Sequence, residues 1–159
     1  RDLHSFPTRR SSDLYSCKAA TRSSGWQSGN GVRDRIAIYG TCTPENLTAA
    51  LASDKRTLIL CDVEGAELAL LDPQAVAGLL RCHVLVELHD FVTRGLSDVI
   101  RERFAPSHTI ETIWQTERRR RDFPFDGLYA TLVPESYLRS VMHEWRPERM
   151  AWFWMEPRE

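Results

Sequence analysis

The sequence has few lysines, no closely spaced cysteine pair and no long apolar run. Only Lys18 and Lys55 are lysines among 21 basic residues, and 22 acidic residues leave a net charge of −1. This balance excludes a generally basic nucleic-acid-binding protein. No apolar stretch approaches the roughly 18 residues that a membrane-spanning helix needs. The 159 residues, 42% of them hydrophobic, instead predict one folded domain with a substantial core.

The four cysteines show no metal-binding or redox spacing. Cys17, Cys42, Cys61 and Cys82 are far apart in the sequence, and no CxxC motif occurs. Cys61 and Cys82 lie in or beside apolar runs, where a cysteine usually packs as a small hydrophobic residue. We therefore expect free, buried thiols, which suit a reducing cytoplasm.

Residues 1–14 resemble a translated sequencing adapter. The segment, RDLHSFPTRRSSDL, has neither the period of a strand nor that of a helix, and it lacks the apolar core of a secretion signal. We expect it to be an artefact outside the fold. Residues 15–27 contain no acidic residue and form an ill-defined remnant. A single domain is expected over residues 28–159.

From Arg33 onward, apolar runs alternate with helical patterns. The runs 57–62 and 83–88 are almost continuously apolar, which is typical of strands buried on both faces. Thr43 followed by Pro44 predicts the start of a helix. This alternation predicts an α/β fold with a doubly wound, mostly parallel, Rossmann-like sheet. The other expected elements are strands at 36–39, 109–115 and 150–155, helices at 65–71, 72–80, 97–104 and 134–145, and an irregular surface insertion at 118–129.

Ionisable side chains gather where the two long apolar runs end. Asp62 and Glu64 follow the first run, and Glu87, His89 and Asp90 lie at the end of the second. In an open α/β sheet, ligands bind beyond the carboxyl ends of the parallel strands, so these positions predict a site in a cleft. Each residue taken alone could instead cap a helix or pair with an arginine.

The segment DVEGAE at residues 62–67, with apolar residues after it, resembles the signature of FkbM-type methyltransferases. Residues 86–89 (VELH) are similar to the family's fifth strand, residues 30–36 to the entry of its third, and residues 150–155 to its last. The resemblance covers about residues 28–157.

This resemblance implies the class I methyltransferase fold and S-adenosyl-L-methionine as cofactor. The methyl group would pass to a hydroxyl of a small or carbohydrate-like acceptor, with no nucleic-acid or membrane partner. Gly40, Thr41 and Cys42 would border the adenine ring, and Asp62 would also contact the cofactor. The family's first strand and glycine-rich turn have no counterpart here, so we expect the 159-residue chain to bind cofactor poorly and to be inactive. The oligomeric state stays open.

The ionisable residues at the ends of the two apolar runs are expected to have different roles in catalysis. His89 is the favoured base for the acceptor's hydroxyl, because imidazole exchanges protons near neutral pH. Asp62 and Glu64 are alternative bases or anchors, and Glu87 and Asp90 are expected to bind the acceptor. A metal-dependent hydrolase is a second hypothesis, because these five side chains offer oxygen and imidazole ligands for magnesium or manganese. A partly folded, inactive fragment is a third.

Overall fold

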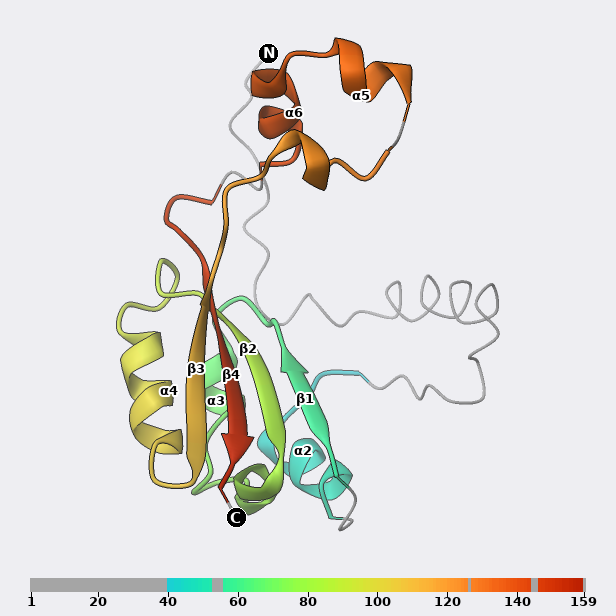
Figure 1. The fold of residues 1–159 in the computed structure, drawn as a ribbon. Coiled ribbons are helices and arrows are strands. Elements are labelled where there is room, and N and C mark those ends of the chain that lie inside the picture. The colour runs from blue at the N-terminus through green and yellow to red at the C-terminus, as the bar shows by residue number, and fades with distance from the viewer. Residues whose placement is uncertain (1–39, 53–55, 126, 144–145, 159) are drawn as a thin grey trace, which may run out of the picture.

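The fold is described by a computed structural model over residues 40–52, 56–125, 127–143 and 146–158. The segments 1–14 and 15–27 and the strand expected at 36–39 lie outside this range. The described part forms a four-stranded sheet with helices against it, and an arm of short helices extends beyond one end of the sheet (Figure 1). No described helix is both long and apolar enough to cross a membrane.

The strands follow the predicted apolar runs closely. Of the expected helices, 97–104 forms at full length, 65–71 and 134–145 are shorter than expected, and 72–80 forms only a 3₁₀ segment at 77–81. The strands are β1 (Leu58–Cys61), β2 (His83–Leu88), β3 (His108–Trp114) and β4 (Ala151–Pro157). The α-helices are α2 (Pro44–Ala50), α3 (Glu67–Leu70), α4 (Leu96–Phe104), α5 (Leu128–Leu132) and α6 (Glu135–Val141). Two short 3₁₀ helices, η3 (Ala77–Arg81) and η4 (Arg120–Asp122), are also present. Helix α2 begins as predicted, with the Thr43 hydroxyl accepting a hydrogen bond from the Asn46 N–H at 3.3 Å.

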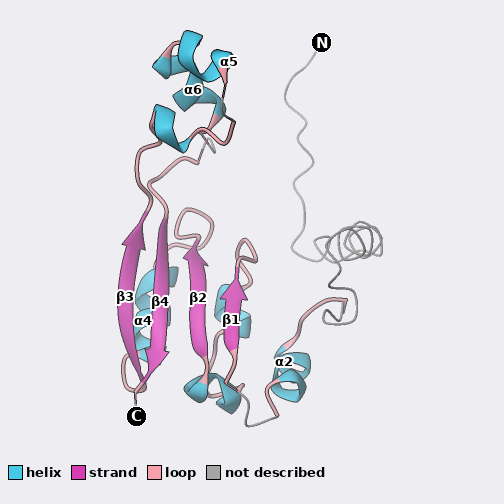
Figure 2. Ribbon diagram, turned by 45° about the vertical axis from the view of Figure 1, so that its right-hand side comes forward, coloured by secondary structure: helices cyan, strands magenta, loops and turns pink. Residues whose placement is uncertain are grey.

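The sheet has the order β1-β2-β4-β3 and a mixed direction (Figure 2). β1 and β2 are parallel, whereas β4 runs antiparallel to both of its neighbours, β2 and β3. The prediction of a doubly wound, mostly parallel, Rossmann-like sheet is therefore wrong. An apolar run indicates that a strand is buried, but it carries no information on strand direction. The last strand accordingly enters the middle of the described sheet, antiparallel to the strands on either side.

The hydrophobic core lies on one face of this sheet. Alternate residues of β2 and β4 point into it, among them Val84, Val86, Phe153 and Met155, and they pack with side chains of α3, α4 and η3. Figure 1 shows α3 behind the strands, and Figure 2 shows α4 behind β3 and β4. The described helices thus leave the opposite face of the strands open, which also departs from a doubly wound arrangement.

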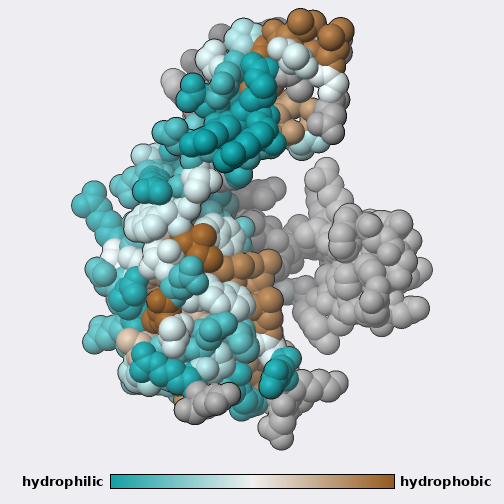
Figure 3. Space-filling view, viewed as in Figure 1, coloured by the Kyte–Doolittle hydropathy of each residue, from teal (hydrophilic) through white to brown (hydrophobic). Residues whose placement is uncertain are grey.

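The open face carries exposed apolar side chains. Leu58 and Leu60 of β1 are 58% and 67% exposed, so β1 is not buried on both faces as its sequence predicted. Figure 3 shows apolar surface on the β1 side of the sheet and again at the tip of the arm, where α5 exposes Leu128 and Leu132. Cys61 is buried and free, as expected.

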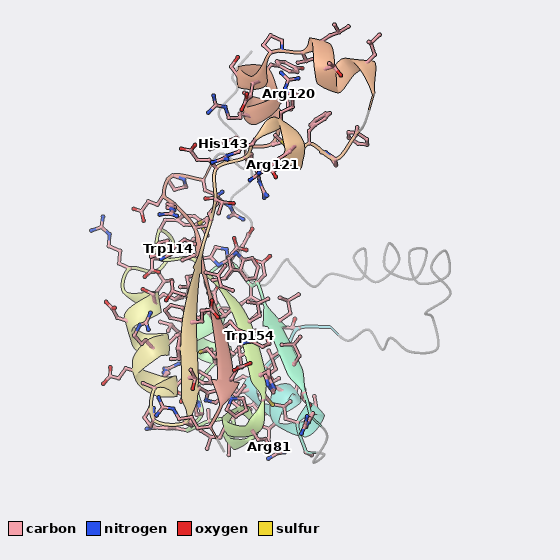
Figure 4. The ribbon with its side chains drawn as sticks, in the orientation of Figure 1. Arg81, Trp114, Arg120, Arg121, His143 and Trp154 are labelled. Carbon is pink, nitrogen blue, oxygen red and sulfur yellow. The ribbon has the colours of Figure 1, made fainter. Side chains whose placement is uncertain are left out.

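The arm spans residues 115–149, between β3 and β4. The Arg149 Nε donates to the Gln115 carbonyl at 3.0 Å, and this hydrogen bond joins the two ends of the arm at its base. Within the arm, the Arg120 guanidinium donates to the Val133 carbonyl at 2.8 Å. Figure 4 places Arg120, Arg121 and His143 in the arm. The arm leaves the sheet at the edge where β1 and β2 end, so its base borders the predicted site (Figure 1).

Candidate functional site

The parallel pairing of β1 and β2 brings the ends of both apolar runs to one edge of the sheet. Cys61, the last residue of β1, lies opposite Val86 of β2. The residues that follow, Asp62 and Glu87, therefore lie beside each other, and His89 comes directly after β2. The structure thus brings together Asp62, Glu87 and His89, three of the five residues expected at this edge.

His89 is fully buried, and one of its ring nitrogens is held by a carboxylate. Its Nδ1 lies 2.6 Å from Oε1 of Glu67, a buried residue of α3. Because a carboxylate only accepts hydrogen bonds, Nδ1–H is the donor, and the neutral ring keeps its lone pair on Nε2. The second Glu67 oxygen accepts the Gly65 N–H at 2.8 Å, which fixes the carboxylate in turn.

The other ring nitrogen of His89 faces two further carboxylates without a hydrogen bond. Nε2 lies 3.7 Å from Asp62 Oδ1 and 3.9 Å from Glu87 Oε2, which is too long for a hydrogen bond. Among the described residues, Nε2 is buried and has no hydrogen-bond partner. A buried polar atom left without a partner costs about 1–3 kcal/mol, so this one requires an explanation.

Negative charge accumulates at this cluster. Burial raises the pKa of the Glu87 carboxyl above its ordinary value, and the nearby Asp62 carboxylate raises it further. A protonated His89 would act in the opposite direction on that pKa, and the Arg146 guanidinium does act in that direction. The Arg146 Nη2 lies 3.9 Å from Glu87 Oε1. The net effect is a site that favours an additional positive charge, either a proton or a cation.

A pocket of about 460 Å³ opens onto the cluster. Asp62 and Glu87 form part of its wall, and Trp114, Trp152 and Arg146 form another part. Figure 4 shows Trp114 at the end of β3, where the arm begins. Apolar and charged side chains thus converge from the sheet edge and the base of the arm, which suits a small ligand with hydroxyl groups.

Two of the predicted site residues lie outside the cluster of Asp62, Glu87 and His89, and their site roles stay predictions. Asp90 Oδ1 accepts hydrogen bonds from the Ser97 N–H at 3.1 Å and the Ser97 hydroxyl at 3.0 Å, so it holds the first turn of α4. Glu64 is exposed in the turn between β1 and α3, with a φ of 47°. Neither residue belongs to the cluster around Nε2.

The segment expected to border the adenine ring forms the loop that leads into α2. Gly40 and Thr41 are exposed, and the Thr41 carbonyl accepts a hydrogen bond from the Asn46 side chain at 3.0 Å. Cys42 is half-buried against the core. The described contacts of these residues serve this loop, and their cofactor-binding role stays a prediction.

Glu67 is the site residue that sequence reasoning missed. It was identified only as part of DVEGAE, yet it makes the shortest contact to His89. A signal was present, because Glu67, Leu70 and Leu71 stand at the i, i+3 and i+4 spacing of one helix face, and all three are buried. A carboxylate on an apolar helix face needs a partner.

No protein-family model matches the chain, no curated protein matches it, and no solved structure matches it.

Proposed function

We propose that the protein is an S-adenosyl-L-methionine-dependent methyltransferase acting on a hydroxyl of a small or carbohydrate-like acceptor. The resemblance of DVEGAE and of residues 86–89 to FkbM-type enzymes supports this function. One structural observation links the two segments: Asp62 and Glu67, the first and last acidic residues of DVEGAE, both contact His89 at the end of the next strand.

In this function, His89 accepts the proton of the acceptor's hydroxyl. Methyl transfer forms a carbon–oxygen bond and breaks the carbon–sulfur bond of the sulfonium, so the hydroxyl proton must leave the oxygen. The lone pair on Nε2 takes that proton, and Glu67 holds the ring through Nδ1 and stabilises the imidazolium that forms. Such a base contributes about 10²–10⁴-fold to the rate.

The surroundings of the cluster suit the proposed acceptor. Asp62, half-exposed in the pocket wall, accepts a hydrogen bond from a hydroxyl group, and Trp114 and Trp152 offer apolar ring faces. The cofactor-binding role of Gly40, Thr41 and Cys42 belongs to the same proposal, and it rests on the resemblance alone. A cytoplasmic location fits the three described cysteines, all of which are free.

A cofactor titration tests this function. Because residues 1–14 resemble an adapter, two forms are compared: the 159-residue chain, and a form in which residues 1–14 are replaced by the sequence that the source DNA encodes before Tyr15. We expect the second form to bind S-adenosylhomocysteine and to transfer a labelled methyl group to polyhydroxylated acceptors, and the first to bind weakly. Absence of S-adenosylhomocysteine binding by both forms would overturn the proposal.

A further inference from the structure

We propose that Asp62, Glu87 and His89 bind one divalent cation, such as Mn²⁺, between their side chains. Each residue offers one ligand atom, and the three atoms lie within 4.8 Å of one another. Cation binding does not depend on the proposed function, since it requires neither cofactor nor acceptor.

The distances at Nε2 suit two ligands of one ion. With metal–ligand bonds of about 2.1 Å, two ligand atoms on one cation lie about 3.0 Å apart at a right angle and about 4.2 Å apart when opposite. The separations of 3.7 Å to Asp62 and 3.9 Å to Glu87 fall between these limits. The Asp62 side chain is 51% exposed, so it has room to turn toward an ion.

The unpartnered His89 Nε2 distinguishes this cluster from a simple group of acidic residues. Nε2 is buried, has no hydrogen-bond partner among the described residues and points between two carboxylates. A coordinate bond to a cation would use this lone pair. Imidazole with carboxylates is a donor set that suits manganese, iron or zinc, and it leaves positions for water or substrate oxygen.

Glu67 completes the arrangement behind the ligands. Metal-binding histidines usually donate their other ring N–H to a carboxylate, which fixes the ring and makes the ligand nitrogen more basic. Glu67 accepts this hydrogen bond from His89 at 2.6 Å, and Gly65 fixes Glu67 in turn. The inner ligands and this outer support both come from residues at the ends of β1 and β2 and the start of α3.

The local charge favours a cation and also limits its affinity. Two carboxylates face Nε2, whereas the Arg146 guanidinium lies 3.9 Å from the other oxygen of Glu87. A positive charge at this place weakens cation binding. Replacing Arg146 by Gln should therefore tighten Mn²⁺ binding if the ion lies in this cluster, and should leave the affinity unchanged if it binds elsewhere.

A bound cation would change how the acceptor hydroxyl is activated. A divalent cation lowers the pKa of an oxygen that it coordinates, and its bond to Nε2 would make His89 a ligand instead of a base. Metal dependence of the methyl transfer distinguishes the two roles. Cofactor binding and cation binding are measured separately, so the failure of one leaves the other standing.

The test uses Mn²⁺ binding to the 159-residue chain. The loss of the free-ion electron paramagnetic resonance signal gives affinity and stoichiometry, and pulsed measurements detect coupling of bound Mn²⁺ to ¹⁴N. We expect one saturable ion with the coupling of a single imidazole nitrogen. Absence of saturable binding, or bound Mn²⁺ without nitrogen coupling, would overturn the proposal.

Two exposed carboxylates of the same turn supply matched variants. Asp62→Asn replaces an anionic ligand by a weaker, neutral amide oxygen, and Glu64→Gln removes the same charge two residues away. Neither side chain belongs to the buried core. Loss of an outer-shell partner alone typically costs 10–100-fold in metal affinity, so we expect Asp62→Asn to lose at least about tenfold. Equal losses in both variants would show a diffuse charge effect and would contradict the site.

Discussion

Two fully buried histidines lie at opposite ends of the sheet and differ in how their ring nitrogens are satisfied. At the start of β3, the His108 Nδ1 pairs with the Ser107 hydroxyl at 2.8 Å and its Nε2 with the Cys82 carbonyl at 3.0 Å. At the end of β2, His89 has Glu67 on Nδ1 and no hydrogen bond on Nε2. Burial alone therefore does not distinguish the two histidines; the hydrogen bonding of Nε2 does.

The electrostatic surroundings of the two rings reinforce this difference. The rings of His108 and Phe104 pack in a T-shaped contact, and burial lowers the pKa of the His108 ring, which keeps the ring neutral. His89 has the carboxyls of Glu67, Asp62 and Glu87 around it. The ring at the His108 end is therefore held by neutral hydrogen-bond partners, whereas the ring at the His89 end is surrounded by three carboxyl groups.

The largest expected contrast is in turnover. Asparagine can place its amide nitrogen near the position of Nδ1 but has no counterpart of Nε2. In the form with residues 1–14 replaced, His89→Asn should therefore keep the contact to Glu67 and lower methyl transfer by about 10²–10⁴-fold, because the base or ligand atom is gone. His108→Asn should leave turnover unchanged at a temperature where it is folded. Equal turnover of the His89 variant and the unsubstituted protein would remove His89 from the mechanism.

In the free energy of unfolding, we expect the opposite order, with the larger loss in the His108 variant. His108→Asn leaves the Cys82 carbonyl without its buried partner, so we expect a loss of about 1–3 kcal/mol in the free energy of unfolding. His89→Asn removes an atom that has no such bond, and its loss should be smaller. Urea unfolding followed by tryptophan fluorescence measures both values. A larger loss for the His89 variant would contradict the assignment of structural and functional roles.

The smallest effect should be a pH dependence that arises at the His89 end. The Glu87 pKa is raised by burial, so the folded protein keeps this proton at pH values where the unfolded chain has released it. Stability should therefore decline as pH rises above the ordinary value of 4.5, and the decline should end above the folded-state pKa. Glu87→Gln should remove this decline, which thermal unfolding across pH measures. An unchanged pH profile in that variant would show that another group is responsible.

Much of the local structure could be predicted from the sequence. The run at 83–88 became β2 with the same bounds, and Thr43 and Pro44 marked the start of α2. The strand direction could not be predicted, because buried strands show the same apolar character whether they run parallel or antiparallel. β4 is the example: its residues identify a strand, and only the folded pairing shows that it runs opposite to β2.

The candidate site was predictable in part for a related reason. Acidic residues at the ends of two parallel strands converge on one edge, and this placed Asp62 beside Glu87 and His89. Asp90 was expected at the same strand end, and its Oδ1 accepts the Ser97 N–H at the start of α4, outside the cluster. Its role in acceptor binding stays a prediction. Glu67 was missed because its approach to His89 depends on the turn at Glu64 and Gly65, both of which have positive φ values. Long-range contacts of this kind are set by tertiary geometry.

Because β1 is an edge strand of the described sheet, one member of the cluster is held less firmly than the others. Asp62 directly follows this four-residue strand, which among the described strands pairs only with β2, whereas Glu87, His89 and Glu67 are buried. If β1 frays from its neighbour, Asp62 leaves while the other three side chains keep their positions. The apparent affinity of the proposed cation site would then depend on the fraction of molecules in which β1 is paired with β2. Any change that lowers this fraction would weaken cation binding in proportion.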